Sequence, residues 1–86
     1  MSDRTILIVD DDEVTAENLR ELLEFMDKPS VITAACADWK ERLGDRRMEA
    51  LFVGPDLTEK KLTGLLTELK DIDATVPVVM CEEHRS

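Results

Sequence analysis

A run of four apolar residues at positions 6–9 stops abruptly at three consecutive aspartates, and this junction narrows the choice of fold more than any other part of the chain. An unbroken apolar run rich in β-branched residues is typical of a strand buried on both faces, as central strands of parallel sheets are. The aspartates Asp10, Asp11 and Asp12 are therefore expected at the carboxyl end of that strand. Ligand sites of open α/β sheets lie at this end.

Helix and strand patterns alternate along the rest of the chain. Apolar residues recur at helical spacing over residues 13–27, 38–44 and 58–71, and they are Leu19, Leu22, Leu23 and Met26, then Trp39 and Leu43, then Leu62, Leu65, Leu66 and Leu69. Short apolar strands are predicted over residues 31–35, 50–53 and 76–81. The order β-α-β-α-β-α-β predicts one flavodoxin-like (CheY-like), doubly wound parallel sheet with helices on both faces.

The charge balance excludes several classes of partner. A formal net charge of −9 argues against direct binding to nucleic acid or to an anionic membrane, since both need clustered basic residues. The basic pairs Arg46-Arg47 and Lys60-Lys61 are expected to be solvated surface. No apolar run is long enough to span a bilayer, and Cys36 and Cys81 have no metal-site spacing. These features predict reduced core cysteines in a cytoplasmic protein.

Residues 6–12 resemble the first strand and acidic pair of response-regulator receiver domains. In that family the acids hold Mg²⁺, and an aspartate that ends the third strand accepts phosphate. The resemblance therefore implies a residual, weak Mg²⁺ site at Asp10 and Asp11, with no other cofactor. The family's last helices and fifth strand, which carries a lysine, are absent from these residues.

The phosphoacceptor position is where the resemblance breaks. Receivers place a leucine-rich pair eleven residues after the acceptor, and counting back from Leu65-Leu66 reaches Gly54, which has no side chain to phosphorylate. Asp56 is the alternative acceptor, because Gly64 follows it at a spacing that receivers often show. In receivers a threonine or serine ends the fourth strand. That position falls near Glu82 in this sequence, so the resemblance implies that the hydroxyl group is also absent.

A narrower resemblance rests on Asp38-Trp39, residues 51–54, Leu65-Leu66, Leu69 and residues 77–80. These residues are similar to the N-terminal domain of FleQ-type flagellar regulators, which are NtrC-like, sigma-54-dependent transcriptional activators. Such proteins also have a central ATPase domain and a helix-turn-helix domain. The resemblance implies that residues 1–86 are a single degenerate receiver domain, the N-terminal regulatory part of a longer protein.

Several positions keep two interpretations. Asp12 and its neighbours either bind metal or favour the first helix, with Asp12 as its N-cap. Asp56 is either a displaced acceptor or an N-cap that forms a capping box with Glu59. Trp39 is either an exposed contact or a core residue, and its spacing with Leu43 favours the core. His84 has no partner that suggests catalysis.

No motif indicates a catalytic residue or an enzyme. Three functions stay open: a non-phosphorylated regulatory and dimerisation module, a working phosphoreceiver that uses Asp56, and a stand-alone protein-binding adaptor. A homodimer is expected, because the strand over residues 76–81 would form an apolar sheet edge. The first helix and this edge are the candidate interfaces. Other expected partners are further domains of the parent regulator or a separate regulatory protein.

Overall fold

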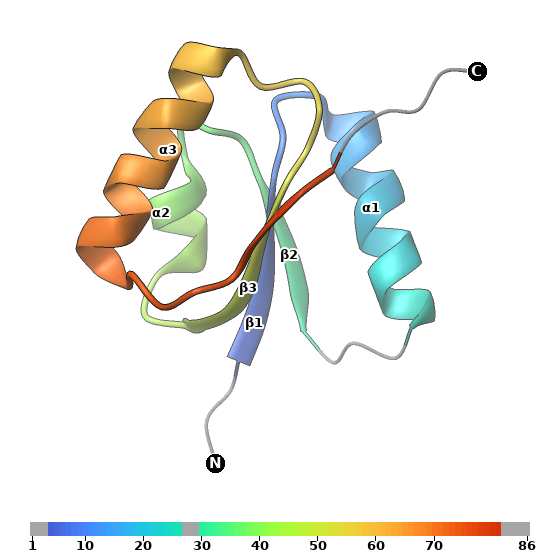
Figure 1. Cartoon of the computed structure of the whole chain (residues 1–86). Helices are drawn as coiled ribbons and strands as arrows, with labels where there is room; N and C mark the ends of the chain where they lie inside the picture. The colour runs from blue at the N-terminus through green and yellow to red at the C-terminus, as the bar shows by residue number, and fades with distance from the viewer. Residues whose placement is uncertain (1–3, 27–29, 82–86) are drawn as a thin grey trace.

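A computed structural model describes residues 4–26 and 30–81. Its elements run β1 (Arg4–Val9), α1 (Glu13–Phe25), β2 (Val31–Ala34), α2 (Trp39–Leu43), β3 (Arg47–Val53), α3 (Glu59–Ile72) and β4 (Val78–Met80). The four strands are all parallel and lie in the order β2-β1-β3-β4. Figure 1 shows α1 on one face of the sheet and α2 with α3 on the other. The predicted flavodoxin-like α/β fold is confirmed.

The central strand β1 explains this layering. Its side chains alternate between the two faces, and each face contributes to its own apolar cluster. Leu7 and Val9 pack in a cluster with residues of α2, α3 and β3. Ile6 and Ile8 pack against α1. Because β1 is covered on both sides, it needs the unbroken apolar run that its sequence has.

The first helix differs from its prediction in the face that it buries. Asp12 caps α1 as expected, since its carboxylate accepts a hydrogen bond from the Val14 N–H at 2.9 Å. The buried side chains are Ala16 and Leu23, whereas Leu22 and Met26 are 62% and 65% exposed. The predicted stripe was therefore wrong at those two positions, because the helix packs through the line of residues that starts at Ala16.

The other two helices are bounded by local capping. Trp39 is buried at 2% exposure, which confirms its place in the core. Gly44 ends α2 with a φ of 59°, a left-handed conformation that glycine adopts without strain. At α3 the N-cap is Thr58, whose hydroxyl accepts from the Lys61 N–H at 3.2 Å. The predicted Asp56 cap was wrong, because Thr58 directly precedes the helix.

The observed bounds of the strands and helices differ from the predicted ones by a few residues. β1 and β3 begin earlier than predicted, at Arg4 and Arg47, and β4 is three residues long. A register shift between Thr5 and Ile6 accommodates the longer β3. The predicted end of the first helix falls at Asp27, outside the described residues. Within the described residues, no helix is long and apolar enough to cross a membrane.

Candidate functional site at the carboxyl ends of the strands

The sequence-predicted site residues come together at one end of the sheet. Asp10 follows β1, and its N–H donates to the Ala34 carbonyl at 3.0 Å. The Gly54 N–H, after β3, donates to the Val9 carbonyl at 3.0 Å. The Cys81 N–H, after β4, donates to the Val53 carbonyl at 2.8 Å. These bonds continue the parallel ladder past the strand ends and hold the site's backbone in place.

Asp10 is buried, and one of its two carboxylate oxygens has no hydrogen-bond partner among the described residues. The side chain is 3% exposed, and its Oδ1 accepts from the Asp12 N–H at 2.8 Å. Its Oδ2 is buried and has no hydrogen-bond partner among the described residues. Burial raises the pKa of this carboxyl, the Asp12 N–H lowers it, and the nearby Asp56 carboxyl raises it, and together these effects place the pKa at about 6. The environment of Asp10 therefore favours its protonated form more than water does.

Gly54 is the position from which a receiver's phosphoacceptor would extend. It is buried, and the Asp10 carboxyl group fills the space beside its Cα. A Cβ built at Gly54 would lie 2.5 Å from Asp10 Cγ and 2.7 Å from Asp10 Cβ. Carbon atoms in contact normally lie about 3.5–4.0 Å apart. The site thus has no room for any side chain at position 54 while Asp10 keeps its conformation.

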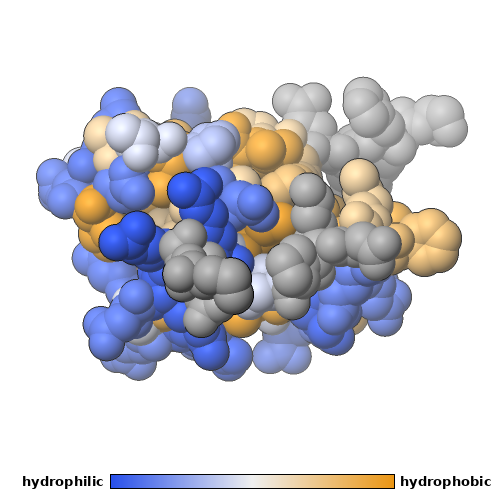
Figure 2. All heavy atoms as spheres, turned by 90° about the horizontal axis from the view of Figure 1, so that it is seen from below, coloured by the Kyte–Doolittle hydropathy of each residue, from blue (hydrophilic) through white to orange (hydrophobic). Residues whose placement is uncertain are grey.

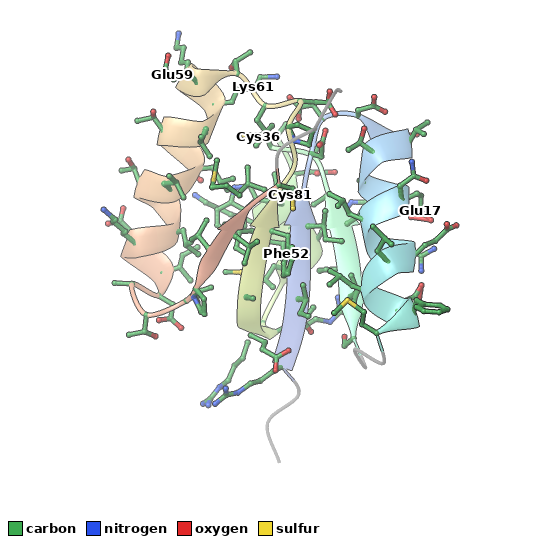
Figure 3. The ribbon with its side chains drawn as sticks, turned by 45° about the vertical axis from the view of Figure 1, so that its right-hand side comes forward. Glu17, Cys36, Phe52, Glu59, Lys61 and Cys81 are labelled. Atoms are coloured by element: carbon green, nitrogen blue, oxygen red, sulfur yellow. The ribbon has the colours of Figure 1, made fainter. Side chains whose placement is uncertain are left out.

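The neighbouring acid, Asp11, pairs with Lys61 of α3, the helix on the sheet face opposite α1. Its Oδ2 accepts from Lys61 Nζ at 2.5 Å, and its Oδ1 accepts from the Cys36 N–H at 3.0 Å. These two donors hold the pKa of Asp11 below its usual value, and the carboxylate raises the pKa of Lys61 in return. In Figure 3, Lys61, Cys36 and Cys81 lie at the same end of the sheet. Asp11 is thereby tied to α3 and to the loop between β2 and α2.

Lys61 is the residue of this site that the sequence interpretation missed. The pair Lys60-Lys61 was expected to be solvated surface, and Lys61 is exposed as expected, but its ion pair with Asp11 was not predicted. A positional signal was present. Thr58 caps the helix, so Lys61 lies in its first turn, and the first turn of α3 faces the same sheet end as the residues after β1.

The acids of the site fit a resident Mg²⁺ poorly. Among the described residues, no group of three or more His, Cys, Asp or Glu side chains is placed to hold a metal ion. The ammonium of Lys61 already compensates Asp11, and Gly54 supplies no third carboxylate. Half of the residues that line a hollow of about 320 Å³ beside Asp10 and Asp11 are acids, and its basic residue Arg42 pairs with Asp38. Residual Mg²⁺ binding at Asp10 and Asp11 stays a prediction that this geometry disfavours.

The remaining predicted residues lie around these acids. Asp56 is exposed, in the turn between β3 and α3, with its carboxyl near Asp10. Cys36 and Cys81 are half-buried free thiols, Cys36 packs against the core cluster on the α2 and α3 face, and burial raises the pKa of each. Glu82 and His84 lie outside the described residues.

Comparison with known proteins identifies the family. The family model described as "Flagellar regulatory protein FleQ" matches residues 5–86, which is nearly the whole chain. No curated protein and no solved structure matches it. The matched segment includes Gly54, both acids after β1 and Lys61. The chain therefore belongs to the FleQ family of flagellar regulatory proteins.

Proposed function

We propose that this domain is the N-terminal regulatory module of a longer flagellar transcription activator, and that it acts through contacts with partners without being phosphorylated. The observation that carries the proposal is the packing of Asp10 against Gly54. A receiver needs a carboxylate at that place, and here a buried carboxyl from β1 occupies it.

The pairing of Lys61 with Asp11 supports the same proposal. Phosphoryl transfer depends on cations placed in advance around the transferred group. In this site the lysine's positive charge neutralises an acid that a metal ion would otherwise need. Asp56 supplies an exposed carboxylate, but the neighbouring Asp10 carboxyl adds no positive charge that would attract an anionic phosphoryl donor.

The test is incubation of the domain with acetyl phosphate and Mg²⁺, followed by intact-mass measurement. We expect no adduct on the wild-type protein and none on Gly54→Asp, because an aspartate there cannot enter without displacing Asp10. An Asp56→Asn variant is the matched control. A stoichiometric phosphate adduct that appears on wild type and disappears in Asp56→Asn would establish a working phosphoreceiver and overturn the proposal.

We further propose that the module self-associates through the outer face of α1. Its exposed apolar residues are Val14, Leu22, Phe25 and Met26, and Phe25 is 90% exposed. Leu22 and Phe25 line a shallow hollow with Asn18 and Glu21. Apolar atoms also project on the α1 side in Figure 2. Exposed apolar residues that share one helix face are typical of protein contacts, and a two-fold axis is the commonest way to pair them.

The charge of the same helix predicts how association depends on salt. Arg20 forms ion pairs with Glu17 and Glu24, which lowers the net negative charge beside the apolar face. The whole chain still carries −9, so added salt should screen repulsion and strengthen association. Sedimentation at tens of micromolar protein measures this at low and at moderate salt.

Two variants separate the candidate interfaces. Phe25→Ser should abolish the dimer if α1 forms the contact, because the side chain is almost fully exposed and its loss costs the monomer little. Val79→Thr, on the edge strand β4, is the control and should leave the dimer intact. A monomeric wild type at both salt concentrations would refute self-association, and loss of the dimer only in Val79→Thr would move the interface to β4.

A further inference from the structure

A second hollow lies at the opposite end of the sheet, where the strands begin. It has a volume of about 390 Å³, and its lining includes Arg4, Arg46, Arg47, Glu49, Ile72 and Asp73. Leu43 and Val76 are buried apolar side chains of this lining, whereas Ile72 is 54% exposed. Viewed from below, strongly hydrophilic side chains gather at this end next to apolar atoms (Figure 2).

Chain geometry brings the three arginines together. Gly44, with its φ of 59°, turns the chain at the end of α2 and leads it back to the start of β3. Arg46 and Arg47 therefore lie where β3 begins. Arg4 begins β1, the neighbouring strand, and it is the direct register partner of Arg47.

This arrangement is electrostatically unfavourable by itself. Adjacent strands with like charges directly opposite repel each other. The chain has 20 acidic residues, yet no described carboxylate forms an ion pair with any of these three arginines. Within residues 4–26 and 30–81, the Arg46 guanidinium makes a single long hydrogen bond, to the Arg42 carbonyl at 3.4 Å. Unneutralised charges of one sign beside an apolar hollow are a feature of binding surfaces.

The lining also restricts the kind of anion. Three arginines face two acids, Glu49 and Asp73, so the hollow has one net positive charge. A single net positive charge is neutralised by one carboxylate, whereas a phosphate dianion would leave an excess negative charge. The lining has no aromatic side chain on which a nucleotide base would stack, but it has an exposed isoleucine and buried apolar walls.

From these features we infer that the hollow at the start of β1 and β3 binds an acidic segment of a partner protein, in which a carboxylate neighbours a bulky apolar side chain. The carboxylate is placed among Arg4, Arg46 and Arg47, and the apolar side chain packs on Ile72 and Val76. This surface lies at the sheet end opposite Asp10 and Gly54, so it operates whether or not the domain is phosphorylated.

The test uses the capped peptide acetyl-Leu-Glu-Phe-amide, with acetyl-Leu-Gln-Phe-amide as its neutral match, titrated into the domain while amide NMR spectra are recorded. We expect the acidic peptide to shift the amides of Met48, Ile72 and Val76. Loss of one charge-assisted contact should weaken the neutral peptide about tenfold. Equal shifts from both peptides, or no shift at these amides, would overturn the inference.

Matched variants separate local contacts from total charge. The triple variant R4Q/R46Q/R47Q should lose the peptide response. The variant K40Q/K60Q/K70Q removes the same number of positive charges elsewhere and should retain the response. The thermal midpoint of Arg47→Gln should be unchanged or higher, because the substitution relieves the repulsion with Arg4. Equal loss of binding in both triple variants would mean that only net charge matters.

Two further titrations distinguish other occupants. Inorganic phosphate that shifts the same amides more strongly than the acidic peptide would make this a phosphate site. Shifts at these amides on raising the protein concentration alone would identify a second copy of the chain as the occupant. Either result would contradict the assignment to an acidic partner segment.

Discussion

Substitution of Gly54 by alanine tests the steric argument at the centre of the proposed site. The added Cβ would lie 2.5 Å from Asp10 Cγ, about 1 Å closer than carbon atoms normally approach. The Asp10 side chain must turn away, and its backbone must also shift, because Asp10 Cβ would lie 2.7 Å from the added Cβ and the hydrogen bond to the Ala34 carbonyl holds that backbone in place. Turning breaks the 2.8 Å bond from the Asp12 N–H to Oδ1.

The two costs give the expected magnitude. Overpacking a buried site costs about 1–3 kcal/mol, and a lost hydrogen bond about 1 kcal/mol more. We therefore expect Gly54→Ala to lower the free energy of unfolding by about 2–4 kcal/mol. With a urea m-value of about 1 kcal/mol/M for so small a domain, the unfolding midpoint should fall by about 2 M or more.

Two comparisons make the assay decisive. Gly64→Ala is the matched control, since Gly64 lies inside α3 with no atom within 4 Å of an added Cβ. It should stabilise the domain by about 0.5–1 kcal/mol, the opposite sign. In the Asp10→Gly background both the clash and the Asp12 N–H bond are gone, so Gly54→Ala should cost little and the double-mutant cycle should show a coupling of about 2–4 kcal/mol, nearly the whole cost of the single substitution. An unchanged midpoint in Gly54→Ala, or an equal loss in both backgrounds, would refute the reasoning.

Three further outcomes follow from the same contacts. The folded-state pKa of Asp10 is raised from 3.8 to about 6. Its contribution to the free energy of unfolding is therefore complete below about pH 4 and is lost as pH rises through about 6. In urea titrations across pH, Asp10→Asn should remove up to about 3 kcal/mol of this pH dependence, and less where water reaches the open sheet end. Lys61→Met should cost only about 0.5–1 kcal/mol, because the ion pair with Asp11 is partly exposed, and should tighten Mg²⁺ binding in calorimetry by freeing that acid. Trp39→Ala should cost about 3–5 kcal/mol in chemical unfolding, whereas Trp39→Phe should cost less.

Local sequence carried most of the information on helix and strand types. The run at residues 6–9 predicted a central strand because a strand covered on both faces cannot alternate apolar and polar residues. The interpretation of Asp12 as an N-cap and the place of Leu65 in the apolar stripe of the third helix are confirmed, since capping and helical spacing depend on residues a few positions apart.

The buried side of α1 was beyond the reach of periodicity alone. Leu22 and Met26 have helical spacing with Leu19, yet they are exposed because α1 packs on Ile6 and Ile8 of the sheet through Ala16, Leu19 and Leu23. The cap of α3 was misplaced for a related reason. Both Asp56 and Thr58 have capping side chains, and only the path of the chain after Gly54 decides which one precedes the helix.

For the candidate site, the sequence by itself determined that Asp10, Asp11 and Gly54 follow two strands and must meet at one sheet end, because parallel strands align their carboxyl ends. Only the tertiary structure decided how the two acids differ. Asp10 turns into the space beside Gly54, while Asp11, one residue later, turns toward Lys61, which is 50 residues away in sequence. Such pairings depend on how far each strand extends and how each helix is placed, and those are set by packing of the whole chain rather than by any local pattern.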